Sequence, residues 1–332
     1  MAKGNIIPVF VPHLGCPYAC VFCDQKRISG AVRPVAPADV AAAIERGLRK
    51  SETPAQLAFY GGSFTAIPPA EQEALLGAAA PYLRPGRLSG IRISTRPDYI
   101  DLETLTRLSR YGVDTVELGA QSMDEDVLKV CGRGHRASDT VNASRLIKER
   151  GFFLVLQMMT GLPASNRERD VETARRLIDL QPDAARIYPT VVLRGTALYR
   201  LWQAGAYAEH TVENAVETCA EILPLFEQAH IPVIRLGLNP SAGLSAGEAV
   251  AGAYHPALGE LVKSRILLHQ ARAVLAHAPR GRSVTLTVGK GRASQMAGQH
   301  RCNLAALQAE FGFKKIMIRE REQDDGEVEL FI

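Results

Sequence analysis

The sequence predicts an α/β protein built on a parallel sheet, with a smaller α/β unit at its C-terminal end. Three observations indicate this fold class. Short apolar runs alternate with longer helical patterns, six such strand-and-helix units follow one another, and a basic block comes after a segment of Gly and other small residues. Such a sheet is covered by helices, as either a doubly wound sheet or a barrel. In both arrangements the functional loops lie at the C-terminal ends of the strands.

Six strands are predicted, each followed by a loop and a helix. The strands cover residues 5–12, 56–60, 90–95, 115–119, 152–158 and 184–188, and the helices cover 37–49, 69–83, 101–111, 137–150, 167–180 and 212–229. Two helices begin with Pro and carry an acidic residue in the first turn, Asp39 and Glu71, as helix starts commonly do. The unusual residues, including HLGCPYACVFCDQ, YGGSFTAIP and TGLP, fall in loops that follow strands.

Length and composition exclude disordered, fibrous and membrane-spanning proteins. The chain has 332 residues, 46% hydrophobic and 22% charged, which suffices for one large domain or a large and a small one. No apolar stretch is long enough to cross a bilayer. The apolar run near the N-terminus contains Pro8 and is too short for a secretory signal. We therefore expect a soluble, cytoplasmic protein without a membrane partner.

The net charge of +4 is concentrated near the C-terminus. Residues 1–259 hold 27 basic and 27 acidic side chains, residues 260–319 hold 11 and 2, and residues 320–332 hold 1 and 6. A segment of small residues, 239–252, separates the neutral part from the basic one, so domains of 1–245 and 246–332 are predicted. The basic block suits an acidic partner such as nucleic acid.

Residues 283–319 predict a strand, a short helix, the tight turn GQHR, a longer helix and a strand. This order resembles a KH module, whose G-x-x-G turn grips a nucleic-acid backbone, although Arg301 replaces the second glycine. The candidate nucleic-acid contacts around the turn are Lys290, Arg292, His300, Arg301, Lys314 and Lys315. The alternative is a solvated basic face on a small α/β unit.

Three cysteines lie together after the first predicted strand. Cys16, Cys20 and Cys23 have the spacing C-x3-C-x2-C, which lets thiolates from one loop converge on one metal centre. Soft sulfur ligands select zinc, copper or iron–sulfur clusters. A structural zinc needs a fourth ligand, for which His13 is the nearby candidate. Three ligands on a four-iron cluster instead leave one iron open for a substrate or cofactor.

The other three cysteines stand outside this motif. Cys219 lies in a helical pattern and Cys302 in the basic block, so both are expected to pack in a core. Cys131 lies in a loop next to a glycine, where it is either an ordinary loop thiol or a hydrogen-atom donor.

The cysteine motif, with Phe22 before its last cysteine and Gly61-Gly62 after the second strand, resembles the signature of the radical S-adenosylmethionine (SAM) superfamily. The resemblance implies a partial (β/α)6 TIM-like barrel in which the cysteines hold a [4Fe-4S] cluster and SAM binds the open iron. It also implies reductive cleavage of SAM to a 5′-deoxyadenosyl radical, with electrons from a flavodoxin- or ferredoxin-type reductant.

From residue 57 to residue 207 the chain is similar to the radical SAM half of the Elongator catalytic subunits, which modify wobble uridines in tRNA. The similarity rests on FYGGSFTAIP, ISTRPDYI, GVDTVELGAQSM, RGH, MMTGLP and ARIYPTVVLRGTALYRLWQAGAY. The chain departs from that family in its shorter first cysteine gap, in Ser94 where Glu is usual, and in ending at Ile332, before any acetyltransferase domain. These departures argue against carboxymethylation chemistry.

Motif positions imply which residues contact SAM. They are Gly61, Gly62, Ser63, Ser94, Gln121, Arg133 and Gln157. Arg133 matches an arginine that pairs with the SAM carboxylate, where a guanidinium engages both oxygens, and the glycines allow close backbone approach. For Gln121 and Gln157 the alternative is a buried amide that closes a strand end. His135 either caps a helix or acts in catalysis.

The sequence therefore predicts a radical SAM enzyme that acts on RNA, with tRNA as the expected partner. One alternative keeps the chemistry but gives it a small porphyrinogen-like substrate, and another is a non-catalytic RNA-binding protein with an iron–sulfur cluster. A steep salt dependence of RNA affinity separates the first alternative from the prediction. Formation of 5′-deoxyadenosine from SAM separates the second.

Overall fold

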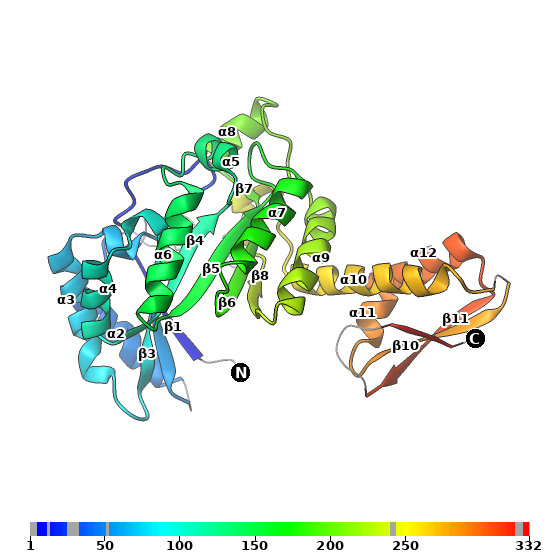
Figure 1. Cartoon of the computed structure of the whole chain (residues 1–332), viewed down its shortest axis with the longest axis horizontal. Coiled ribbons are helices and arrows are strands. Elements are labelled where there is room, and N and C mark those ends of the chain that lie inside the picture. The colour runs from blue at the N-terminus through cyan, green and yellow to red at the C-terminus, as the bar shows by residue number, and fades with distance from the viewer. Residues whose placement is uncertain are drawn as a thin grey trace.

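The main body of the protein is a curled, seven-stranded parallel sheet in the order β1-β2-β3-β4-β5-β6-β8. The computed structural model describes residues 5–11, 14–24, 33–50, 53–239, 244–279, 281–322 and 328–331. The strands are β1 (Asn5–Phe10), β2 (Ala55–Tyr60), β3 (Leu88–Thr95), β4 (Val113–Gln121), β5 (Phe153–Thr160), β6 (Ala184–Pro189) and β8 (Val233–Leu236). Helices cover the outer face of the sheet, which gives a half-barrel (Figure 1).

All six predicted strand-and-helix units are present, which confirms the α/β class and the partial barrel. The covering helices are α2 (Pro37–Leu48), α3 (Pro69–Ala79), α4 (Leu102–Arg110), α6 (Ala137–Glu149), α7 (Arg167–Ile178) and α9 (Val212–Gln228). Side chains cap several of them. Asp101 accepts a hydrogen bond from the Thr104 N–H, and Asn166 accepts one from the Arg169 N–H. Such caps satisfy N–H groups that the first helical turn leaves unpaired.

Alternation along each strand divides its side chains between the helices and the concave face. In β1, Ile7 and Val9 are buried and join the same core as Val40 and Ile44 of α2, whereas Phe10 remains exposed on the other face. Burying a side chain of this size stabilises the fold by about 1.5–3 kcal/mol. The outer face of the sheet is thus the core, and the concave face is left for function.

The sheet has one strand more than predicted. β8 has four residues, one exposed and three partly exposed, so its sequence lacks a strong apolar signal. Further elements that were not predicted are α5 (Glu125–Val130), α8 (Ala197–Gln203), α10 (Leu258–Leu275) and the antiparallel pair of β7 (Val191–Leu193) and β9 (Ala249–Gly252).

A smaller unit lies beyond α10 and holds its own three-stranded sheet (Figure 1). It consists of β10 (Ser283–Gly289), α11 (Ala293–Ala297), a 3-10 turn over Gln299–Arg301, α12 (Cys302–Phe311), β11 (Lys315–Arg321) and β12 (Glu329–Phe331). The predicted succession of strand, helix, turn, helix and strand is therefore present. Leu258 and Val262 of α10 belong to the main core, whereas Leu267 belongs to the second. The boundary between residues 245 and 246 stays a prediction.

Two expectations about this smaller unit were wrong. β10 and β11 run parallel with Ser283 beside Lys315, so Lys314 and Lys315 lie at the opposite end of the sheet from Lys290, about 20 Å away at the rise of a strand. The six basic residues therefore do not surround one turn. Cys302 is exposed rather than packed in the core, because it is the first residue of α12 and follows the turn directly.

None of the helices in the described part of the chain is both long and apolar enough to span a bilayer.

Candidate active site

The loop with the three cysteines follows β1 and is held by backbone hydrogen bonds from distant segments. The Leu14 carbonyl accepts from the Ser63 N–H (3.0 Å), and the Val21 N–H donates to the Cys131 carbonyl (3.1 Å). The Val21 carbonyl accepts from the Leu198 N–H at the first turn of α8 (2.7 Å). His13, considered as a zinc ligand, lies outside the described residues.

Two glycines let this loop touch the segment after β2. A Cβ atom on Gly62 would lie 2.3 Å from the Val11 carbonyl oxygen and 2.5 Å from that of Leu14. A Cβ atom on Gly15 would lie 2.3 Å from the Ser63 carbonyl oxygen, and Gly15 has a φ of +73°. Side chains cannot occupy these positions without moving the backbone. The glycine predicted to approach SAM is therefore also required where the two loops meet.

The three cysteines form no disulfide and are partly exposed. A turn connects two of them, because the Cys23 N–H donates to the Cys20 carbonyl (3.0 Å). Burial and the neighbouring Cys20 raise the pKa of the Cys16 thiol, while Arg96 and Arg133 act in the opposite direction. Across the residues that the structure describes, no three His, Cys, Asp or Glu side chains are arranged to hold a metal ion. The fit to an iron–sulfur cluster therefore rests on the donor set: three soft sulfur ligands on one loop beside two guanidinium groups.

Arg133 connects the cysteine loop to the end of β4. Its Nη1 donates to Cys20 Sγ (3.3 Å) and its Nη2 donates to the Gly119 carbonyl (2.6 Å). Its side chain is buried, and Nε has no hydrogen-bond partner among the described residues. Arg133 thus brings a buried positive charge to a cysteine sulfur, as expected for a residue that meets an anionic ligand.

A second arginine, Arg96, holds Arg133 in place. Its Nη2 donates to the Arg133 carbonyl (2.5 Å), and its guanidinium forms two hydrogen bonds of 2.9 Å with the Asp98 carboxylate. The Tyr18 ring, from the cysteine loop, lies 4.9 Å from the guanidinium carbon of Arg96. Cation–π contacts of this kind add about 0.5–2 kcal/mol. The two arginines and the loop therefore form one connected structure.

The two serines predicted to contact SAM have different surroundings. Ser63 is fully buried; its Oγ lies 3.0 Å from Thr95 Oγ1 and accepts from the Arg96 N–H (3.3 Å). Ser94 is partly exposed on the concave face, and its hydroxyl donates to Glu117 (3.5 Å). Ser63 therefore organises the strand ends, and Ser94 lines the open face.

The two glutamines lie together. Gln121 is buried and has a φ of +66°, at a point where the register between β4 and β5 shifts. The Gln157 Nε2 donates to the Gln121 Oε1 (3.3 Å). The backbone conformation of Gln121 is rare for a residue other than Gly, Asn or Asp and is common at functional sites.

His135 and Cys131 are buried near the arginines. Burial, with Arg133 and Arg96 nearby, lowers the pKa of His135 to about 3, so its ring is neutral at neutral pH. Burial raises the pKa of the Cys131 thiol to about 12, so the thiol is protonated. Cys219 is fully buried in the main core, as predicted.

A charged network on the concave face was missed by the sequence analysis. The Glu117 carboxylate is nearly inaccessible and accepts hydrogen bonds from Arg92 Nη1 (2.6 Å), Arg186 Nη2 (2.9 Å) and the Tyr60 hydroxyl (3.3 Å). The Arg186 Nη1 also donates to the Tyr188 hydroxyl (3.3 Å). The available signal was a charged residue inside each of three predicted strands: Arg92 in β3, Glu117 in β4 and Arg186 in β6.

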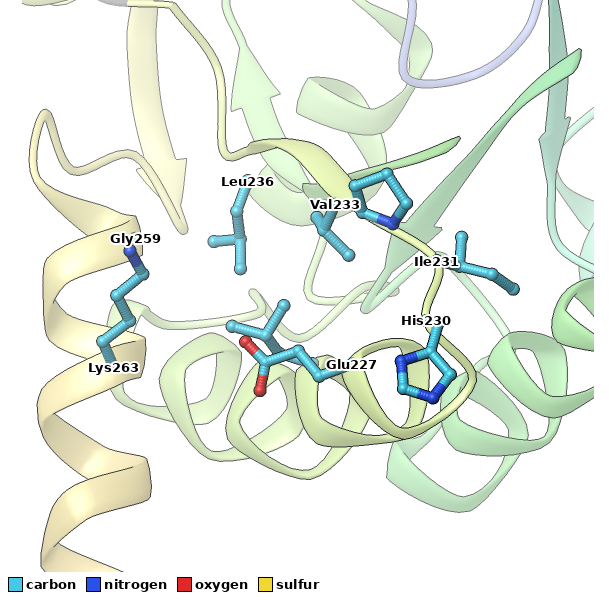
Figure 2. Close-up of a pocket in the computed structure, with 9 residues that line it drawn as sticks. Glu227, His230, Ile231, Val233, Leu236, Gly259 and Lys263 are labelled. Carbon is cyan, nitrogen blue, oxygen red and sulfur yellow. The ribbon is translucent and has the colours of Figure 1, made fainter. Parts of the chain in front are cut away.

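A surface pocket of about 490 Å³ lies between α9, β8 and α10, where Glu227, His230 and Lys263 contribute polar groups (Figure 2). Its lining includes residues 230–232, which precede β8. The lining continues along β8 to Leu236, the last residue of that strand, and includes no residue of the cysteine loop. It is separate from the candidate site.

Comparison with protein families agrees with this geometry. The model described as "Radical SAM superfamily" matches residues 10–177, which include the cysteine loop and most of the half-barrel. The chain belongs to the radical SAM superfamily. A second model, the radical SAM C-terminal domain, matches residues 182–267. The superfamily is one of enzymes, and this membership accounts for the three cysteines at the mouth of the barrel.

Curated relatives of this radical SAM chain include Elongator complex protein 3 and tRNA uridine(34) acetyltransferase. The Homo sapiens Elongator protein is 40% identical over 139 residues, which are 41% of this chain and 25% of the human protein. The acetyltransferase of Methanocaldococcus infernus is 36% identical over 134 residues, 40% of this chain and 25% of that protein. The chain thus matches only a quarter of the length of each relative.

Solved structures share the radical SAM fold. An archaeal Elp3 from Methanocaldococcus infernus has a TM-score of 0.63 at 24% identity, over 80% of this chain and 63% of that chain. Coproporphyrinogen III oxidase from Escherichia coli, a radical SAM enzyme, has a TM-score of 0.52 at 19% identity, over 68% of this chain and 52% of that chain. At these identities the comparison establishes the fold.

Gly62→Ala tests the contact between the two loops. The added methyl group meets two backbone carbonyls, so we expect the free energy of unfolding to fall by about 1–3 kcal/mol. Gly77→Ala in α3 is the matched control, because its Cβ would meet only a Tyr111 ring carbon at 3.9 Å. In a helix that change should stabilise by about 0.5–1 kcal/mol. Urea denaturation measures both; equal stability of the Gly62→Ala and wild-type proteins would contradict the geometry.

Proposed function

We propose that this radical SAM enzyme holds a [4Fe-4S] cluster on Cys16, Cys20 and Cys23 and cleaves SAM reductively. The observation that carries the proposal is the set of three cysteines outside any disulfide on one anchored loop, with Arg133 hydrogen-bonded to Cys20 Sγ at 3.3 Å. When bound, the cluster and SAM supply an electron and a carbon-centred radical that removes a hydrogen atom from the substrate. We expect a flavodoxin- or ferredoxin-type protein to deliver the electron.

The chain's own residues would hold SAM at the C-terminal ends of β2 to β5. Gly61, with a φ of +90°, and Gly62 present backbone without side chains. The Arg133 guanidinium supplies positive charge for the SAM carboxylate, and the neutral His135 ring adds none beside it. Ser94, Gln121 and Gln157 provide hydroxyl and amide groups around the same strand ends.

We further propose that the substrate is RNA, with tRNA as the expected class. The relatives that share the barrel are named for tRNA modification or for the Elongator complex. The second support is the basic end of the smaller unit, which lies next to the main body. The Gln295 Nε2 of α11 donates to Glu260 (2.7 Å), and the Asn303 Nδ2 of α12 donates to Ser264 Oγ (3.0 Å). Glu260 and Ser264 belong to the part of α10 that begins at the main core.

The turn between α11 and α12 presents basic side chains at this end. His300 and Arg301 are exposed and have φ values of +50° and +64°. Lys290 and Arg292 precede α11, whereas Lys314 and Lys315 lie at the start of β11, at the far end. We therefore propose that the RNA backbone contacts His300, Arg301, Lys290 and Arg292, because phosphate contacts position a nucleic acid on its enzyme.

Cys20→Ala tests the cluster and the chemistry. After anaerobic reconstitution the variant should bind less iron and sulfide per chain and form no 5′-deoxyadenosine from SAM under dithionite, because a thiolate ligand is lost. Cys302→Ala, which removes an exposed thiol outside the site, is the matched control and should behave as the wild type. Formation of 5′-deoxyadenosine by Cys20→Ala at the wild-type rate would contradict the proposal.

Arg301→Gln tests the RNA assignment. Removal of one phosphate contact should weaken RNA binding at every sequence and reduce the slope of log affinity against log salt by about 1. Arg84→Gln is the control, since Arg84 is also exposed but precedes β3, at the other end of the half-barrel from the site. Filter binding of a tRNA at several salt concentrations measures both slopes. If Arg301→Gln shows the same slope as Arg84→Gln and the wild type, the turn does not contact RNA.

A further inference from the structure

The edge strand β1 exposes an aromatic ring on the concave face of the half-barrel. Phe10 is 38% exposed, and Ile6, on the same face of the strand, is 37% exposed. Ile7 and Val9 point the other way and are buried. Phe10 is the last residue of β1 and so lies at the mouth of the half-barrel, where an exposed ring offers a surface to a ligand.

Phe10 forms one side of an aromatic pair that continues into the barrel. The rings of Phe10 and Tyr60 are 6.4 Å apart between centroids and inclined by 45°. The guanidinium carbon of Arg186 lies 5.7 Å from the centroid of the Tyr60 ring, and its Nη2 donates to the Tyr60 hydroxyl (3.2 Å). Flat apolar surface and hydrogen-bond donors therefore lie next to each other on β1, β2 and β6.

Charge at this place is incompletely compensated. Among the described residues, Glu117 is the one carboxylate paired with Arg92 and Arg186, so these three side chains together carry a net charge of +1. Arg186 is mostly buried, and its Nε has no hydrogen-bond partner among the described residues. Buried cations require hydrogen-bond acceptors. A ligand with carbonyl oxygens on its edge would supply them.

We propose that Phe10, Tyr60 and Arg186 receive a nucleobase extruded from the RNA, with the base against the aromatic pair and its carbonyl edge toward the arginine. The inference rests on the proposed RNA substrate. Single-stranded bases are recognised by stacking on aromatic rings and by hydrogen bonds to their edges, and enzymes that react with a base take it out of the stack. Tyr60 directly precedes Gly61 and Gly62, so the base would lie beside the segment assigned to SAM.

Photocrosslinking tests this site. The probe is a tRNA anticodon stem-loop with 5-iodouridine in the loop, irradiated with the full-length protein, and the crosslinked peptide is identified by mass spectrometry. We expect the crosslink at Phe10 or Tyr60. Phe10→Leu should lower its yield about tenfold, because one base–aromatic stack is lost, whereas Phe10→Tyr keeps the ring and should retain the crosslink. The position of the crosslink in the wild-type protein tests the proposed base site even if Phe10→Leu does not fold.

Phe331→Leu is the control, because Phe331 is another exposed phenylalanine, 49% exposed, on the smaller unit. A crosslink that maps to Phe331, or that keeps its yield in Phe10→Leu, overturns the inference while the RNA-binding proposal stands. Filter binding of the same stem-loop at low salt separates the two failures. If the wild type does not bind the stem-loop, both the RNA substrate and the base site are wrong.

Discussion

The candidate site depends on a close contact between the backbone that leads into the cysteine loop and the backbone that follows β2. Gly62 leaves no room for a methyl group between it and the carbonyls of Val11 and Leu14. That contact sets the loop against the end of β2, and the hydrogen bond from Val21 to Cys131 sets it against the region after α5. Arg133, which follows α5, then joins Cys20 Sγ to the Gly119 carbonyl of β4. The thiols are therefore positioned by the barrel and not by the loop alone.

A network of buried charged side chains stabilises the concave face of the sheet. Glu117 binds two arginines that come from strands on either side of it in the sheet. Removal of one partner from a buried ion pair typically costs about 3–5 kcal/mol, because the other charge is left without compensation. The network therefore holds the strands in register and also gives the barrel floor a positive charge.

Much of the architecture was predictable because local signals are strong there. Period-2 apolar runs, Pro at helix starts and the cysteine spacing predicted the six units and the site loop. β8 was missed because it is short and partly exposed. The contact between Glu117 and Arg186 joins residues 69 positions apart and depends on sheet order, which single-sequence patterns do not contain. A count of charges likewise cannot show that Lys290 and Lys315 lie at opposite ends of the small sheet, because this follows from the parallel pairing of β10 and β11.

The proposed function joins two properties of this barrel, SAM-dependent chemistry and an RNA substrate. The most direct measurement is mass spectrometry of nucleosides from total tRNA of cells that carry the gene, lack it, or carry it as Cys20→Ala. We predict a modified nucleoside that is present with the wild-type gene and absent in the other two strains. Identical nucleoside profiles in all three strains would contradict the proposed function.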